Sequence, residues 1–250
     1  TAIYKALTRL ILPFIILKLG SKSLRFKNAK NYDEFAKAQK FAANNLISLL
    51  TSIQSDFNVI YEIGCGSGIL SKMLMDNLGF KRLILNDLFK SQIMNECEAQ
   101  IGDITQISMP SGLDLVISSS VFQWIYPLEI LSTKIFKSLN NGGLCAFCML
   151  SLGSLNELSS FTNQSLEYKN PDQIDKIFSQ DFQILAKQNY NFIDKFQNLK
   201  ELLNSLKQTG VNNLNGNFKL NKSSLNAMDK HFNQNYKLSY NFYSLIMQKT

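Results

Sequence analysis

Three glycines and one acidic residue lie close together in the stretch VIYEIGCGSG. Glu62 is followed by Gly64, Gly66 and Gly68, so the glycines recur at every second position. Glycine adopts backbone angles that a Cβ atom forbids, and it lets a ligand lie directly against the main chain. The spacing alone is a weak signal, because glycine-rich turns serve many nucleotide sites and many ordinary turns.

The flanking residues predict a strand before this turn and a helix after it. The run FNVIYEI is apolar and partly β-branched, and SGILSKMLMDNLG has helical spacing. A strand, a tight glycine turn and a helix open a nucleotide-binding α/β unit. In a dinucleotide enzyme the turn faces a pyrophosphate, beside which the Glu62 carboxylate would be unfavourable. That carboxylate suits an ammonium group, so the pattern favours S-adenosylmethionine (SAM), which carries an amino-acid tail and no phosphate, over NAD.

Acidic residues also follow the next two predicted strands. KRLILND ends in Asp87, and CEAQIGDI holds Asp103. Ligands of open α/β sheets bind outside the carboxyl ends of the strands, so we expect these acids at one edge with Glu62. Asp87 lies about twenty residues beyond the glycine turn, the offset at which a carboxylate accepts hydrogen bonds from ribose. Asp103 would face the adenine amino group, with Ile104 over the ring, although a lone acid at a strand end often only forms a turn.

The segment SSSVFQWIYP follows a fourth predicted strand, LDLVISSS, and is expected to cross the mouth of the pocket. Ser118 and the two serines after it can supply hydroxyls beside the methionine part of SAM. Gln123 offers an amide and Trp124 an apolar wall. A lone tryptophan serves equally well as core packing.

Strands and helices alternate along the first part of the chain, which predicts a parallel, doubly wound sheet. NYDEFAKAQKFAANNLISLL reads as one amphipathic helix capped by Asn31 or Asp33, and PLEILSTKIFKSLNNGG as a helix stopped at its Asn-Asn-Gly-Gly. Beyond Ser154 the pattern is less regular and ends in the alternating run KLSYNFYSLIMQ. We therefore predict one Rossmann-like domain over residues 26–250, with helices on both faces of a mostly parallel twisted sheet and a helical insertion within about 152–235.

Composition narrows the partners without deciding the function. The chain has 250 residues, 45% of them hydrophobic, with a net charge of +7. The basic residues are scattered, so no nucleic-acid partner is expected, whereas an acidic protein partner is compatible with the charge.

Residues 1–25 form an apolar leader whose uncharged part is shorter than the ~20 residues of a membrane span. A packing helix, a remnant of a preceding segment or an interfacial anchor all remain open, and we expect no stable membrane insertion.

The four cysteines do not predict a metal site. Cys145 and Cys148 have the spacing of a CxxC motif, but they fall in a predicted strand, where positions three apart point to opposite faces. There is no second CxxC, and His231 is the only histidine in the sequence. We interpret the cysteines as core residues, compatible with a reducing compartment, and expect a cytoplasmic protein.

Several of these segments carry a family resemblance. YEIGCGSG, LILND, GDI and LDLVISSS resemble the motif series of class I SAM-dependent methyltransferases. From about Phe26 onward, NYDEFAKAQKFAANNLISLL, VISSSVFQW, LNNGGLCAFCMLSLGSLNEL and NLKELLNSLKQTGVNNL resemble the malonyl-acyl-carrier-protein O-methyltransferases of biotin synthesis. The glycine motif is shared by the whole superfamily, and the other segments are more discriminating.

The resemblance implies methyl transfer from SAM to the free carboxyl of a malonyl thioester on acyl carrier protein, or on CoA, on the route to pimeloyl thioester. It implies a cofactor site made of Glu62, Gly64, Cys65, Gly66, Gly68, Asp87, Leu88, Asp103, Ile104 and Ser118. In the helix that resembles the family's lid, Tyr32 and Gln39 would close over the methyl group, and Gln123 and Trp124 would face the substrate.

The implied chemistry requires no general base. A carboxylic acid has a pKa of about 4, so the acceptor is already an anion at neutral pH. We accordingly assign no catalytic residue and expect a mechanism of positioning and water exclusion. Two alternatives stay open: a SAM-dependent methyltransferase acting on another small carboxylic acid or small molecule, and a methyltransferase-like protein that binds partners without catalysis.

Overall fold

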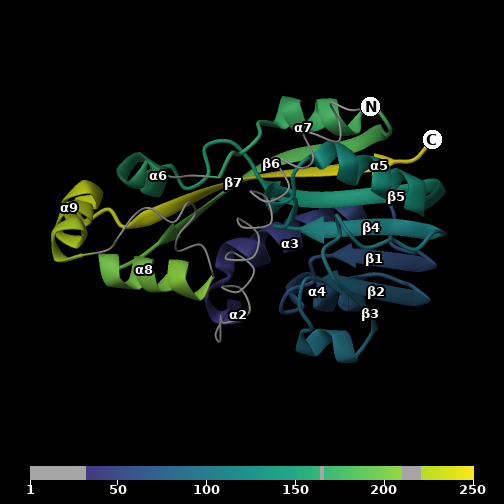
Figure 1. Cartoon of the computed structure of the whole chain (residues 1–250), viewed down its shortest axis with the longest axis horizontal. Coiled ribbons are helices and arrows are strands. Elements are labelled where there is room, and N and C mark those ends of the chain that lie inside the picture. Colours follow the sequence, from purple (N-terminus) through teal and green to yellow (C-terminus); the bar gives the residue numbers. More distant parts are fainter. Residues whose placement is uncertain (1–31, 164–165, 210–220) are drawn as a thin grey trace, which may run out of the picture.

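The computed structural model describes residues 32–163, 166–209 and 221–250 of the chain. Within these ranges one sheet holds seven strands in the order β3-β2-β1-β4-β5-β7-β6 (Figure 1). The strands are β1 (Val59–Ile63), β2 (Arg82–Asp87), β3 (Glu98–Ile101), β4 (Leu113–Ser119), β5 (Leu139–Leu150), β6 (Gln183–Lys195) and β7 (Lys237–Gln248). The first five run parallel, whereas β7 lies antiparallel between β5 and β6. The mostly parallel α/β sheet predicted from the sequence is confirmed.

Helices cover both faces of this sheet. They are α2 (Tyr32–Phe35), α3 (Lys37–Thr51), α4 (Ile69–Asn77), α5 (Leu128–Ser138), α6 (Asn156–Thr162), α7 (Pro171–Phe178), α8 (Leu199–Gln208) and α9 (Lys222–Phe232), with short 3₁₀ turns η1 (Gln92–Asn95) and η2 (Phe122–Trp124). Side chains of α3, α4, α6, α8 and α9 enter one hydrophobic cluster, and those of α5 and α7 enter a second. The helices on both faces that the sequence predicts are therefore present.

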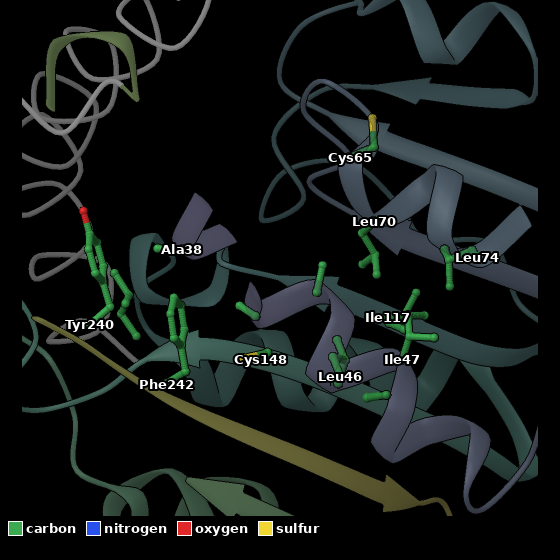
Figure 2. Packing of buried hydrophobic residues seen from close by; sticks show 14 of the residues in the cluster. Ala38, Leu46, Ile47, Cys65, Leu70, Leu74, Ile117, Cys148, Tyr240 and Phe242 are labelled. Carbon is green, nitrogen blue, oxygen red and sulfur yellow. The ribbon is translucent and has the colours of Figure 1, made fainter. Parts of the chain in front are cut away.

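Alternate residues of each strand point to opposite faces of the sheet and so lie in different clusters. Cys145 of β5 lies in the cluster under α5 and α7, and Cys148 lies in the cluster under α3. The prediction that these cysteines point to opposite faces is confirmed, so they cannot share a metal ion. Figure 2 shows part of the α3 cluster, in which Leu46 and Ile47 of the helix lie near Ile117 of β4.

Two helix boundaries differ from the sequence prediction. The N-terminal helix is interrupted at Ala36, so the four-residue α2 precedes α3, and Asp33 lies inside α2 instead of capping the long helix. Asn31 lies outside the described residues. The helix expected to stop at Asn-Asn-Gly-Gly already ends at Ser138, because those four residues belong to the start of β5.

The β6–β7 pair is longer than the rest of the sheet. β5 ends at Leu150 opposite Phe242, but the pairing of β6 with β7 continues outward to Lys195 opposite Lys237. This two-stranded arm therefore projects past the carboxyl ends of the parallel strands, with α6, α8 and α9 arranged around it (Figure 1). The segment predicted as a helical insertion thus contains α6 to α9 together with the 13-residue strand β6.

Asparagine caps fix where the helices α7, α8 and α9 begin. Asn170 begins α7 and Asn221 begins α9, each through a capping box in which two side chains satisfy two backbone amides. Asn198 accepts a hydrogen bond from the Glu201 amide at the start of α8.

Among the helices of the described ranges, none combines the length and the hydropathy needed to cross a membrane. The apolar leader 1–25 lies outside those ranges.

Candidate functional site

The glycine turn has three left-handed residues with different surroundings. A Cβ atom on Gly64 would lie 2.4 Å from a Val121 methyl group, and one on Gly68 would lie 2.8 Å from Ile93. Both glycines are therefore required by the close packing of the turn. Gly66 has a φ of +52°, and a Cβ placed there would meet no atom within 4 Å. It is the position in the turn at which open space lies directly above the main chain.

Glu62 ends β1 with its carboxyl group buried behind this turn. The Ser71 hydroxyl donates a 2.7 Å hydrogen bond to its Oε2 atom, the one hydrogen bond that the described residues give this carboxyl. Burial, helped by the nearby charge of Asp87 and opposed by the Ser71 hydrogen bond, raises the pKa of Glu62 to about 8. A neighbouring cation would favour the ionised form, so the position suits an ammonium group.

Asp87 ends β2 on the other side of the turn. Its Oδ2 accepts the Gly66 amide hydrogen at 2.8 Å, and its Oδ1 accepts the Phe89 amide hydrogen at 3.3 Å. Burial raises the pKa of Asp87, and these backbone hydrogen bonds oppose the shift. A carboxylate has about four acceptor positions, so capacity remains for the hydroxyls of a ligand. Leu88, the next residue, is 40% exposed and presents an apolar surface there.

Asp103 and Ile104 follow β3, where the Gly102 amide donates to the Asp87 carbonyl at 2.9 Å. The Oδ1 atom of Asp103 accepts both the amide and the hydroxyl hydrogen of Thr105 at 2.8 Å, so this carboxylate stabilises a turn after β3. Ile104 is buried in the cluster under α5 and α7. The charge of Asp87 raises the pKa of Glu62. Burial lowers the pKa of Lys134 in α5, and the charge of Asp103 opposes that shift. All three acids therefore lie at or near the carboxyl ends of neighbouring strands, as the sequence predicts, and the Asp103 carboxylate is engaged in a turn.

The end of β4 contributes polar atoms without partners. Ser118 is fully buried, and its hydroxyl donates to the Ile63 carbonyl at 2.8 Å, which ties β4 to β1. By contrast, the hydroxyl oxygens of Ser119 and Ser120 and the Oε1 atom of Gln123 are buried with no hydrogen-bond partner within the described ranges. Leaving such a group unsatisfied costs about 1–3 kcal/mol, so these atoms are natural partners for a ligand.

Three further residues predicted for the site are buried or half-buried. Cys65 is buried, and burial raises the pKa of its thiol to about 12, so the sulfur is unreactive at neutral pH. Trp124 is half-buried in η2, directly after Gln123, and Gln39 is half-buried in α3.

Three tyrosines lie on the lid side of the site: Tyr240 is buried, and Tyr32 and Tyr168 are half-buried. Burial raises the pKa of Tyr32 in α2, and the charges of Asp33 and Asp87 add to the shift, so this phenol lies near the Asp87 carboxylate. The pKa of Tyr240 in β7 is raised by burial and then by Asp194, Tyr168 and Tyr32. Figure 2 shows Tyr240 beside Ala38 of α3. The sequence prediction missed Tyr168 and Tyr240, because nothing local distinguishes them from other aromatic residues of an alternating strand or a loop.

Comparison with known proteins places these features in a family. Residues 61–147 match the family model described as "Methyltransferase domain". A malonyl-[acyl-carrier protein] O-methyltransferase of Bacteroides thetaiotaomicron is 32% identical over 202 residues, which cover 76% of this chain and 77% of that protein. The protein of the same name from Acinetobacter baylyi is 32% identical over 208 residues, covering 79% and 81%. The corresponding protein of Calditerrivibrio nitroreducens is 30% identical, covering 78% and 81%.

Comparison with solved structures shows which proteins share this fold. The YcgJ protein of Bacillus subtilis superposes with a TM-score of 0.61 at 11% identity, covering 82% of this chain and 98% of that one. TehB of Haemophilus influenzae superposes with a TM-score of 0.53 at 12% identity, covering 83% and 62%. At this level of identity the superpositions show a common fold only.

Proposed function

We infer the reaction from one premise: the chain belongs to the malonyl-[acyl-carrier protein] O-methyltransferase family. It is a methyltransferase with a Rossmann-like sheet, and its cofactor is SAM. We propose that it methylates the free carboxyl of a malonyl group held as a thioester on acyl carrier protein. The methyl ester removes the negative charge, so that fatty-acid synthesis enzymes can extend the chain as an apolar primer towards pimeloyl thioester and biotin.

The observation that carries the cofactor site is the arrangement of Glu62 and Asp87 around Gly66. Gly66 opens onto free space, Asp87 is held beside it by the Gly66 amide, and Glu62 is buried behind the turn. SAM supplies a methyl group bonded to a positively charged sulfur. We propose that Glu62 holds its ammonium group, that Asp87 accepts the ribose hydroxyls, and that Leu88 contacts the adenosine. Gly64, Cys65 and Gly68 would shape the turn, and Asp103 and Ile104 would border the adenine.

The unpartnered atoms at the end of β4 extend the site towards the methionine part of the cofactor. Ser118 holds β4 against β1, and we propose that Ser119 and Ser120 donate hydrogen bonds that the described chain leaves unused. Gln123 and Trp124 follow on the acceptor side. On the opposite side, Tyr32, Tyr168 and Tyr240 would donate phenolic hydrogens to the carboxylate or the thioester carbonyl of the acceptor, and Gln39 would complete the lid.

No residue needs to remove a proton, because the acceptor carboxylate is ionised at neutral pH. The task of the chain is to align a carboxylate oxygen with the methyl carbon and to keep water out. Buried side chains such as Ala38 and Tyr240 make the lid side of the site largely apolar. Charge neutralisation between the acceptor and the sulfonium is more favourable there than in water.

Charge supports a protein acceptor. Acyl carrier proteins are acidic, and the net charge of +7 favours their approach. Lys176, Lys200 and Lys207 are exposed and Lys169 is half-buried, and none has an ion-pair partner within the described ranges. We propose them as docking contacts. Malonyl-CoA is the alternative acceptor, and a cytoplasmic location stays a prediction.

The direct test is an assay of the purified protein with radiolabelled SAM and a panel of acceptors: malonyl-carrier protein, malonyl-CoA, free malonate and other small acids. We expect base-labile methyl ester on the malonyl thioesters. Turnover of a different small acid alone would replace the proposed substrate and keep the enzyme class. Failure to bind SAM in calorimetry would indicate a binding protein without catalysis. Rescue of a biotin auxotroph that lacks its own enzyme would test the same proposal in cells.

A further inference from the structure

A polar pocket lies on the outer part of the β6–β7 arm, away from the glycine turn. Its volume is about 700 Å³, and it is formed by α6, α9 and the start of β7. Asn156, Ser159, Ser160, His231, Asn235 and Lys237 are among its lining residues. The side-chain amide of Asn235 makes no hydrogen bond within the described ranges, whereas the hydroxyls of Ser159 and Ser160 donate to backbone carbonyls of α6 at 3.3 Å. The mechanism of methyl transfer proposed above uses none of these residues.

Two lysines beside this pocket indicate an anionic ligand. Lys195 and Lys237 are directly opposite each other in the antiparallel β6–β7 pair, so their side chains project on the same face. Neither has an ion-pair partner in the described part of the chain. Like charges opposite each other destabilise a strand pair. An anion between the two ammonium groups would remove this repulsion.

The acidic residue of the pocket does not neutralise them. Glu157 accepts the Ser239 hydroxyl hydrogen at 2.6 Å with one oxygen and the Ser239 amide hydrogen at 3.1 Å with the other. Its carboxylate is therefore directed at the β7 backbone. The Nε2 atom of His231 lies 3.4 Å from the Ser160 hydroxyl, which adds a second polar group on the α6 side.

The distance from the pocket to the methyl-transfer site fits one part of the proposed substrate. Cys148, opposite Ser119 at the end of β4, pairs with Ser244 of β7, and β5 ends opposite Phe242. Lys237 is five to seven residues further out along the strand, which corresponds to about 17–24 Å at ~3.4 Å per residue. The malonyl group with its phosphopantetheine arm has about sixteen bonds from carboxylate carbon to phosphorus, equivalent to about 19 Å of extended chain.

We propose that this pocket binds the phosphopantetheine arm of the acceptor, with the phosphodiester between Lys195 and Lys237 and the arm amides against the asparagine and serine side chains. The inference rests on the proposed function, since it assigns the carrier end of the same acceptor. Acyl carrier protein and CoA share this arm, so the pocket recognises the chemistry common to both. Along β7, Tyr240 lies between Lys237 and Phe242, where the pairing with β5 begins.

The test uses acceptors that shorten the arm stepwise. With Lys237→Gln, we expect kcat/KM to fall about tenfold for malonyl-carrier protein and for malonyl-CoA, which is the size of one charge-assisted contact. Malonyl-pantetheine lacks the phosphate, and malonyl-N-acetylcysteamine lacks most of the arm. For these two acceptors the same substitution should change kcat/KM by less than about twofold. Ser160→Tyr, which fills the pocket, should lower kcat/KM for malonyl-pantetheine as well and leave the N-acetylcysteamine thioester unaffected.

Lys137→Gln, an exposed lysine at the end of α5 that does not line the pocket, is the matched control and should leave kcat/KM unchanged for all four acceptors. An equal loss for all acceptors with Lys237→Gln, or no loss for any, would overturn the pocket assignment. A loss confined to the carrier protein would also overturn it, in favour of a protein-docking contact. If the unchanged protein methylates none of the four thioesters, the proposed function itself fails, and this outcome is separate from those of the variants. The thermal unfolding temperature of Lys237→Gln shows whether a loss of activity comes from misfolding. It should not be lower than that of the unchanged protein, because one of two repelling lysines is removed.

Discussion

Glu62 is the residue at which we expect protonation and SAM binding to be coupled. Its pKa of about 8 means that most molecules carry a neutral carboxyl at pH 7 before SAM binds. A bound ammonium group lowers this pKa, so binding at pH 7 should release close to one proton. Calorimetry in buffers of different ionisation enthalpy measures that release. With Glu62→Gln, we expect no proton release and a loss of affinity of about tenfold or more, because a charge-assisted contact is removed.

The stability of the same variant provides the control. The pKa of Glu62 is raised above its ordinary value of 4.5, so ionisation destabilises the free fold increasingly as the pH rises from about 4.5 to 8. Glu62→Gln lacks this penalty and should unfold at a higher temperature than the unchanged protein at pH 8. Tight SAM binding without proton release in the unchanged protein would show that Glu62 does not meet the ammonium group.

Gly66 offers a second prediction at the scale of one residue. Gly66→Val should abolish SAM binding, because the side chain enters the open space above the turn. Gly112→Val is the matched control: Gly112 has a φ of +77°, and its Cβ would meet no atom closer than 3.9 Å, but it lies far from the turn. Both variants should lose about 1–2 kcal/mol of stability through backbone strain. Equal SAM affinity of the two variants, measured by calorimetry, would place the cofactor elsewhere.

The sequence predicts the positions of residues that local order fixes, but not the contacts that depend on distant segments. The offset from the glycine turn to Asp87 is set by one strand–helix–strand unit, so it can be read along the chain. The hydroxyl of Ser118 points into the sheet, and those of Ser119 and Ser120 remain unpaired, but this difference arises from the pairing of β4 with β1. No local pattern reports it.

At the scale of elements, α3 is attached to the edge of the sheet by one ion pair. Lys37 contacts Asp194 of β6 at 3.2 Å, with side-chain exposures of 55% and 7%. Solvent screens the lysine, so a double-mutant cycle of Lys37→Met and Asp194→Asn should give a coupling of only about 0.5–1 kcal/mol in urea unfolding. Additive effects of the two substitutions would show that the aromatic contacts of Phe41 with Tyr190 and Phe192 hold the helix without the ion pair.

The order of elements was predictable, but their neighbours were not. Hydrophobic periodicity changes between strands and helices, so the alternation up to β5 could be read from the sequence. The interruption at Ala36 could not, because Ala is a strong helix former and α2 contacts α8, a helix far away in the chain. The place of β7 between β5 and β6 depends on pairing between segments far apart in the chain, which no local propensity encodes.

At the scale of the whole molecule, the net charge of +7 predicts how the acceptor is found. Raising the salt concentration from about 0.05 to 0.3 M shortens the range of charge interactions, so kcat/KM for an acidic malonyl-carrier protein should fall several-fold. The N-acetylcysteamine thioester has no such charged surface, and its kcat/KM should be nearly constant. The measurement is the ratio of the two values at each salt concentration. A constant ratio would contradict electrostatic attraction of the carrier.

The strand order also constrains how the protein is made. β7 is synthesised after β6, yet it fills the gap between β6 and β5. Until residues 237–248 leave the ribosome, β5 exposes a bare edge and β6 has no strand to join it to the sheet. Five parallel strands can assemble during translation, but the arm and the helices around it can close only when this segment arrives. The half of the molecule assigned to the acceptor therefore matures last, and the nascent chain has an unprotected edge that favours association with chaperones.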